Sequence, residues 1–96
     1  MRLDEITGTL NKDDFSTYSA AVDYARLQAS KRGYTVSDDV WHNEITVGSG
    51  APAEGETVRH NLELMYDDQA VEKHLAIQVY NRGTDTGTYE LNYYIT

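Results

Sequence analysis

The sequence has no cysteine, a single proline, no long hydrophobic run and few basic residues. The lack of cysteine excludes disulfides, thiolate metal ligands and cysteine nucleophiles. No apolar stretch approaches the roughly 20 residues of a membrane-spanning helix, so we expect no membrane partner. Eight Lys and Arg residues against 16 acids leave a net charge of −8. This charge disfavours binding to a phosphate backbone, and we expect no nucleic acid partner.

The rest of the composition is that of an ordinary globular protein. Of the 96 residues, 40% are hydrophobic and 25% are charged, which suits one domain spanning residues 1–96. The first eight residues contain two acids and no apolar run. We therefore expect no secretory signal and a cytoplasmic location.

A helix is predicted over residues 13–32. Asp13 and Asp14 stand at its expected start, where carboxylates accept free backbone N–H groups and suit the helix dipole. Gly33 follows its expected end as a left-handed cap. Between these signals, apolar residues recur every three or four positions, at Phe15, Tyr18, Val22, Ala25 and Ala29. This stripe predicts one buried helix face.

Beyond Gly33 the hydrophobic period changes to two. Strands are expected in residues 34–47, as a hairpin or as one bulged strand, and in residues 57–66, 71–81 and 88–95. Segment 48–56, which holds three glycines and the proline, is expected to be a surface loop. The later connections, 67–70 and 82–87, are short and favour antiparallel neighbours. Residues 1–12 are interpreted as a short strand or a turn.

These elements predict a two-layer α+β fold, with one helix packed on a four-stranded antiparallel meander. The helix can cover one face of the sheet. The opposite face is mostly polar but carries Met65, Tyr80 and Tyr94. It is either a solvent face, whose tyrosines reflect β propensity, or a face that binds a partner. Asp67 and Asp68, at its rim, complete the predicted partner-binding set.

The negative charge is confined to one part of the chain. Residues 1–33 contain five acids and five bases, whereas residues 34–96 contain eleven acids and three bases. Three interpretations follow. The acids provide solubility, they face a basic protein partner, or they mimic nucleic-acid phosphates and inhibit a host nucleic-acid enzyme.

The last strand ends as TYELNYYIT, with one charge and neither proline nor lysine. In a simple meander this strand lies at the sheet edge, and such an edge favours a homodimer by edge-strand pairing. The alternative is that residues 1–10 shield the edge.

The sequence carries no convincing catalytic motif. Asp85-Thr86-Gly87 matches the aspartic-protease triplet, but nine residues follow it, so a turn is expected there. His60 and His74 approach each other if their strands pair, and with nearby carboxylates they form the one metal-binding alternative. We expect no enzyme activity, no cofactor and no metal site.

Several segments carry a resemblance: RGYTV from Arg32, then Trp41, a Gly-Pro loop followed by GET, IQVYNRG and YELNYYI. Together they resemble small uncharacterised proteins of marine tailed bacteriophages, cyanophages among them. The resemblance implies a phage accessory protein in the cytoplasm of the host cell, or a minor virion component. Combined with the features above, it favours a small acidic non-enzymatic module that binds a protein through its exposed sheet face.

Overall fold

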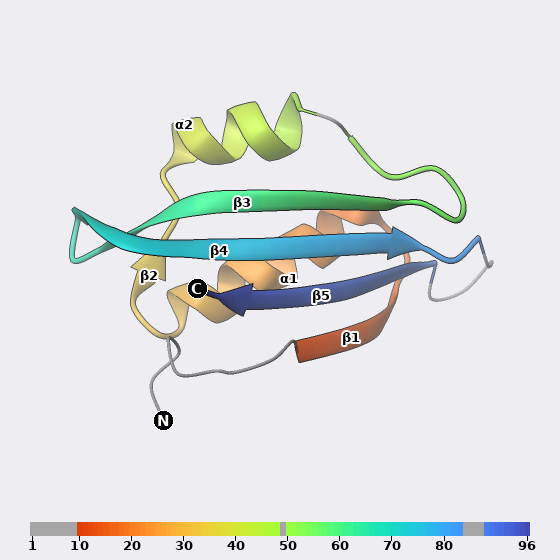
Figure 1. The fold of residues 1–96 in the computed structure, drawn as a ribbon, viewed down its shortest axis with the longest axis horizontal. Coiled ribbons are helices and arrows are strands. Elements are labelled where there is room, and N and C mark those ends of the chain that lie inside the picture. Colours follow the sequence, from red (N-terminus) through yellow and green to blue (C-terminus); the bar gives the residue numbers. More distant parts are fainter. Residues whose placement is uncertain (1–9, 49, 84–87) are drawn as a thin grey trace.

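The computed structural model describes residues 10–48, 50–83 and 88–96. In chain order, its elements are strand β1 (Leu10–Phe15), helix α1 (Tyr18–Ser30), strand β2 (Tyr34–Thr35), helix α2 (Asp38–Trp41), the π-helical turn η2 (His42–Thr46), and strands β3 (Thr57–Tyr66), β4 (Gln69–Asn81) and β5 (Tyr89–Ile95). Figure 1 shows the long strands in front of α1. The predicted α+β class is confirmed.

Helix α1 begins five residues later than predicted. Asp13 and Asp14 do not cap it, because they belong to β1, as does Phe15. The N-cap is Thr17, whose hydroxyl accepts the backbone N–H of Ala20 at 3.1 Å. Threonine and aspartate both cap helices well, so the choice between the two starts is made by the pairing of β1 with the sheet.

Part of the predicted stripe is confirmed, at Val22, Ala25 and Ala29, and the helix ends at Ser30, two residues before the predicted end. The residues that the helix buries are Ala21, Val22, Ala25 and Ala29. After the helix, Gly33 has a φ of +90°, in the left-handed region that glycine adopts without strain. A Cβ at Gly33 would also stand 2.9 Å from the ring of Tyr66, so the close approach of this turn to β3 requires glycine as well.

The strand predicted at residues 40–47 is wrong. The segment is helical, because Ser37 begins α2 by accepting the backbone N–H of Val40 at 3.2 Å. The π-helical η2 continues directly from α2. Trp41 and Ile45, which looked like alternate residues of a strand, are four residues apart on a helix and are both buried.

The sheet has five strands in the order β1-β5-β4-β3-β2, all antiparallel to their neighbours. The expected four-stranded meander runs from β2 to β5, and β1 adds a fifth strand beside β5. Leu10 lies opposite Tyr93 and Phe15 opposite Tyr89. Because β5 is an interior strand, the expectation that it lies at the sheet edge is wrong, and this removes the basis for the homodimer expected there. The alternative, in which the N-terminal segment shields β5, agrees with the structure, because residues 10–15 pair with β5. Residues 1–9 lie outside the described part of the chain.

Strands β3 and β4 form a hairpin with a two-residue turn. Tyr66 pairs with Gln69, and between them Asp67 and Asp68 have φ values of 53° and 60°. Two successive left-handed residues are typical of a type I′ turn, which matches the twist of the strands. Between Glu63 and Met65 the register shifts at an irregularity of the ladder, and beyond it Leu62 lies opposite Leu75.

The loop before β3 is attached to the end of β4 by Asn81. The side-chain amide of Asn81 donates to the carbonyl of Pro52 at 3.0 Å. Its backbone accepts from Gly55 at 2.8 Å and donates to Glu56 at 3.0 Å. These bonds place Glu56 beside the last residues of β4.

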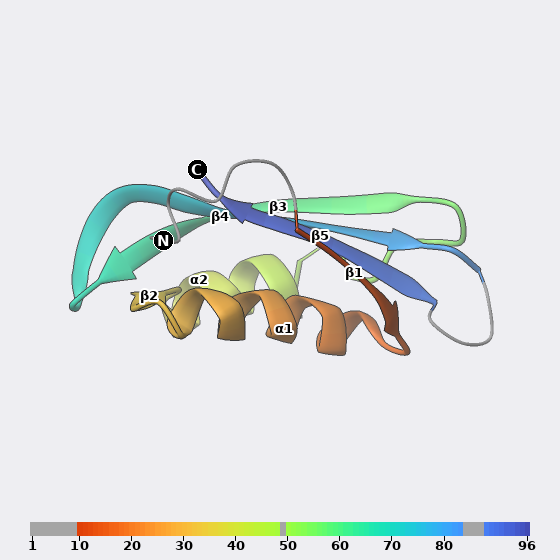
Figure 2. The ribbon, with the colours of Figure 1, turned by 90° about the horizontal axis from the view of Figure 1, so that it is seen from below.

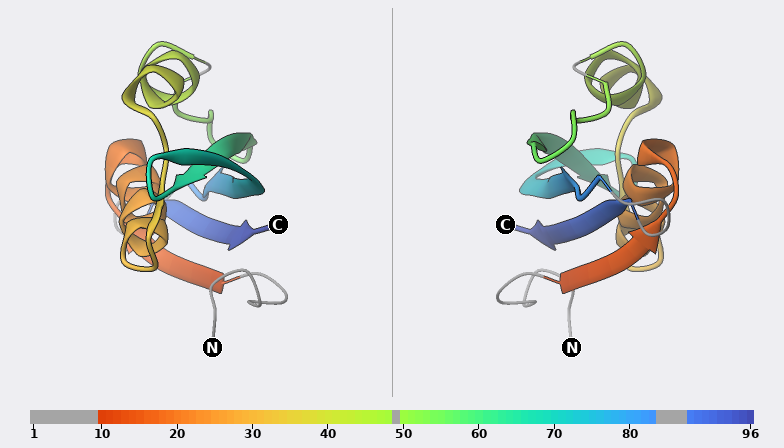
Figure 3. Two further views of the ribbon diagram at one scale, coloured as in Figure 1. Left: turned by 90° about the vertical axis from the view of Figure 1, so that its left-hand side faces the viewer. Right: turned by 90° about the vertical axis from the view of Figure 1, so that its right-hand side faces the viewer.

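The core lies between the sheet and the helices, and Figure 2 shows both helices on the same side of the sheet. The largest fully buried side chains are Leu62, Leu64, Leu75, Ile77, Leu91, Val22 and Val79. Figures 1 and 3 show α2 alongside β3, at the sheet edge opposite β1. The molecule measures 16 Å along its shortest axis, which accommodates two layers. Among the described residues, no helix is long and apolar enough to cross a membrane.

Candidate functional site

The candidate site is the sheet face opposite the helices, here called the open face. The strand registers place on it Thr57, Arg59, Asn61, Glu63 and Met65 from β3, His74, Ala76, Gln78 and Tyr80 from β4, and Glu90, Asn92 and Tyr94 from β5. No helix of the described residues packs on this face (Figure 2). Its side chains alternate with the buried residues of the same strands, as in any sheet with one covered face.

The predicted contact residues are spread along the open face. Met65 lies opposite Ala70, and Tyr80 lies opposite Glu90, so they are near opposite ends of β4. Along β3, the eight residues from Met65 to Thr57, which lies opposite Tyr80, correspond to about 26 Å. Tyr94 lies between them, opposite Ala76, and Asp67 and Asp68 form the hairpin tip beyond Met65. The five residues therefore do not form one cluster.

A hollow of about 220 Å³ lies on the open face around Tyr80. Its lining residues are Thr57, Gln78, Tyr80, Glu90 and Asn92. Thr57, Tyr80 and Glu90 stand side by side on three adjacent strands, and Gln78 and Asn92 form the next row. The tyrosine remains 38% exposed. Sequence analysis named Tyr80 alone, because recognising its neighbours requires the register between strands.

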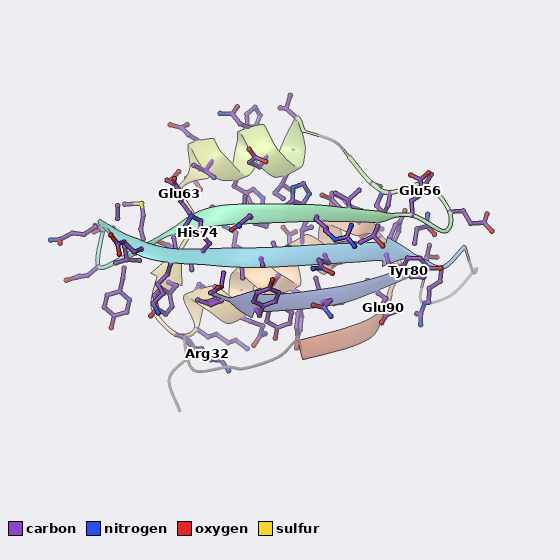
Figure 4. All side chains as sticks on the ribbon, in the orientation of Figure 1. Arg32, Glu56, Glu63, His74, Tyr80 and Glu90 are labelled. Carbon is purple, nitrogen blue, oxygen red and sulfur yellow. The ribbon has the colours of Figure 1, made fainter. Side chains whose placement is uncertain are left out.

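Carboxylates and aromatic rings also gather at the hairpin end of the sheet. Glu63 lies opposite His74 there, and Figure 4 shows the two side chains close together, away from Tyr80 and Glu90. Tyr66, expected on the covered side, is 49% exposed because the sheet extends past the end of α1 at this point (Figure 2). Its ring lies 5.3 Å from that of Tyr34.

The predicted approach of His60 to His74 does not occur. His60 lies opposite Ile77 and is buried under the helices, whereas His74 lies opposite Glu63 on the open face. Side chains on opposite faces of the sheet cannot share a metal ion. Within residues 10–48, 50–83 and 88–96, no group of three histidines or carboxylates is arranged to hold a metal.

His60 is instead hydrogen-bonded to α1. Its Nε2 lies 2.5 Å from the hydroxyl of Tyr18. Burial lowers the pKa of His60, and the nearby Glu44 carboxylate opposes this shift. Burial also raises the pKa of Tyr18. Both shifts favour the neutral forms of the two side chains, and the hydrogen bond joins α1 to β3.

A second hollow, of about 380 Å³, lies between α1 and η2. Its lining residues are Tyr18, Ser19, Val22, Asp23, Trp41, Ile45, Thr46 and Gly50. Arg26 of α1 links α1 to α2 beside this hollow. Its guanidinium lies 4.6 Å from the centre of the Trp41 ring and 2.9 Å from Asp38, and both residues belong to α2. The floor of this hollow is formed by core side chains.

Comparisons with protein-family models, curated proteins and solved structures find no match to this chain.

Proposed function

We propose that the chain is a small non-enzymatic interaction module that binds a basic protein segment through its open face. One observation carries this proposal: all the helices of the described residues lie on one side of the sheet (Figure 2). The other side presents Tyr80, Tyr94 and Met65 among polar neighbours. Tyrosine and methionine are enriched at interfaces, and tyrosine offers a large contact area at low entropic cost.

The charge of the sheet supports a basic partner. Strands β3 to β5 and the turn between β3 and β4 hold five acids and two bases. Acids lie at both ends of the open face, with Glu63, Asp67 and Asp68 at the hairpin end. Glu56 and Glu90 lie at the other end (Figure 4). Complementary charge accelerates association and excludes acidic competitors.

The dimensions of the face suit an extended segment. From the hairpin end to Tyr80 the sheet spans about 26 Å, which an extended chain of about eight residues covers. A partner that contacts both ends of the open face therefore presents about eight residues in an extended conformation.

The resemblance to phage proteins supports a cellular setting for this module. A phage accessory protein acts in the cytoplasm of the bacterial host or within the virion, where basic host and phage proteins are its available partners. In this setting the module binds such a protein and performs no chemistry on it.

The proposal is tested with a fluorescein-labelled ten-residue peptide of alternating arginine and glycine, titrated with protein while anisotropy is measured. The double variant Tyr80→Ser/Tyr94→Ser removes both rings from the open face. Leu27→Ser is the matched control, because Leu27 is 51% exposed on α1, on the opposite side of the molecule. Circular dichroism checks that each variant is folded.

We expect the double variant to weaken binding at least about fivefold and Leu27→Ser to leave it unchanged. Binding should also weaken as salt rises, because exposed charges are screened. Equal loss in both variants, or no binding by the wild-type protein at low salt, would refute the open face as the contact surface.

A further inference from the structure

The hollow at Tyr80 has a polar lining that includes one carboxylate and one aromatic ring. Glu90 supplies a carboxylate, Gln78 supplies a side-chain amide, and Thr57 supplies a hydroxyl beside the exposed ring of Tyr80, whereas the side-chain oxygen of Asn92 is buried. None of the five lining residues is basic. The hollow therefore offers hydrogen-bond acceptors and an aromatic face at a single place, and it complements a group that is rich in donors and positively charged.

The size of the hollow limits its occupant. Its volume of about 220 Å³ is below the roughly 300 Å³ at which small-molecule pockets begin. A single side chain of a bound protein fits this scale better than a free ligand does. The hollow also lies on the face that binds the partner under the proposed function.

Arginine fits this lining better than lysine. A guanidinium is planar, carries five donors and no acceptor, stacks on aromatic rings and can bond a carboxylate through two parallel N–H groups. In the hollow, the ring of Tyr80 and the carboxylate of Glu90 stand on adjacent strands, directly opposite each other. Figure 4 shows both side chains at the same end of the sheet, with Glu56 nearby.

We infer that this hollow is the anchor site for one arginine side chain of the basic partner. The inference rests on the proposed function and makes it specific. The guanidinium lies against the ring of Tyr80, and its N–H groups donate to Glu90 and to the side-chain oxygen of Gln78. Arg59 opposes this binding, because it is exposed on β3 directly opposite Gln78 and repels a second cation.

The test uses two small probes, N-acetyl-arginine amide and N-acetyl-citrulline amide. Citrulline has nearly the same shape but no charge. Each probe is titrated into ¹⁵N-labelled protein, and amide chemical shifts are followed by NMR. The variants are Tyr80→Leu, Glu90→Gln and Arg59→Gln. Glu63→Gln is the matched control, because it removes one open-face carboxylate at the opposite end of the sheet.

We expect the arginine probe to shift the amides of residues 57, 78–80 and 90–92, and the citrulline probe to have little effect. Glu90→Gln and Tyr80→Leu should each weaken binding about threefold or more, since a cation over an exposed ring and an exposed ion pair each contribute modestly. Arg59→Gln should strengthen binding, and Glu63→Gln should not change it.

Two results would overturn the inference. One is a set of shifts spread over all acidic positions, including the hairpin tip. The other is a loss in Glu63→Gln equal to that in Glu90→Gln. If either result is obtained while the ten-residue Arg-Gly peptide still binds the open face, the arginine anchor site is refuted and the proposed function stands. If the peptide itself fails to bind, the proposed function fails first.

Discussion

At the scale of single residues, the bond between Tyr18 and His60 links α1 to β3. Replacing Tyr18 with phenylalanine leaves the buried Nε2 of His60 without its hydrogen-bond partner. Such a loss costs about 1–3 kcal/mol. We therefore expect Tyr18→Phe to lower the free energy of unfolding by about this amount at pH 8, measured by urea denaturation.

His60 also makes stability depend on pH. Because burial lowers its pKa in the folded state, the unfolded chain takes up a proton first as the pH falls below about 6.5. The stabilisation is complete above pH 6.5 and decreases below it. We expect His60→Leu to reduce the loss of stability between pH 7.5 and 5.5, and His42→Gln, at an exposed position, to retain it. If both variants follow the wild-type profile, His60 is not the titrating group.

The backbone conformation of Asp67 and Asp68 lowers the stability of the β3–β4 turn. Both adopt a left-handed conformation, which costs a non-glycine residue about 1 kcal/mol. Asp68→Gly should raise the free energy of unfolding by about 0.5–1 kcal/mol, seen as a higher midpoint in thermal unfolding. Gly33→Ala is the opposite case, because the added Cβ meets the Tyr66 ring, and it should lower the midpoint. An unchanged or lower midpoint in Asp68→Gly would contradict the type I′ geometry.

At the scale of elements, β1 determines whether β5 is an edge. The segment YELNYYI of β5 carries one charge, and β1 covers it. Removing residues 1–16 exposes this edge, and unprotected edges pair with other chains. We expect the truncated protein to self-associate with rising concentration in light scattering after size exclusion, while the full chain shows no such dependence. A truncated protein that stays monomeric would mean that another segment protects β5.

The elements also show what the sequence could predict. Part of the stripe of α1 and the strands β3 to β5 follow from hydrophobic period and turn residues, because their local and tertiary preferences agree. The segment from Val40 to Val47 was wrongly predicted as a strand, because its apolar residues fit the two-residue period of a strand as well as a helical period. Ser37 followed by Asp38 and Asp39 is a helix-start signature that would have corrected it. The pairing of β1 with β5 joins segments that are far apart in the sequence, and no local sequence pattern predicts it.

At the scale of the whole molecule, the helices of residues 10–48, 50–83 and 88–96 all lie on one side of the sheet, and none of them covers the open face. This feature could be predicted, because one short amphipathic helix covers one face of a sheet. The grouping of Thr57, Gln78 and Glu90 around Tyr80 could not, because it depends on how three strands align. The predicted contact residues Met65 and Tyr80 were correctly assigned to one face, but their separation along β4 emerges from the register alone.

The most direct test of the central claim is ¹⁹F NMR of the protein labelled with 3-fluorotyrosine, recorded with a soluble paramagnetic agent before and after addition of the Arg-Gly peptide. Tyr80 is 38% exposed, whereas Tyr93 is 6% exposed on the covered face. We predict that the agent broadens the Tyr80 signal strongly and the Tyr93 signal weakly, and that the peptide protects Tyr80. A Tyr80 signal as protected as that of Tyr93 in the free protein, or one that the bound peptide leaves unchanged, would contradict the open face as a binding surface.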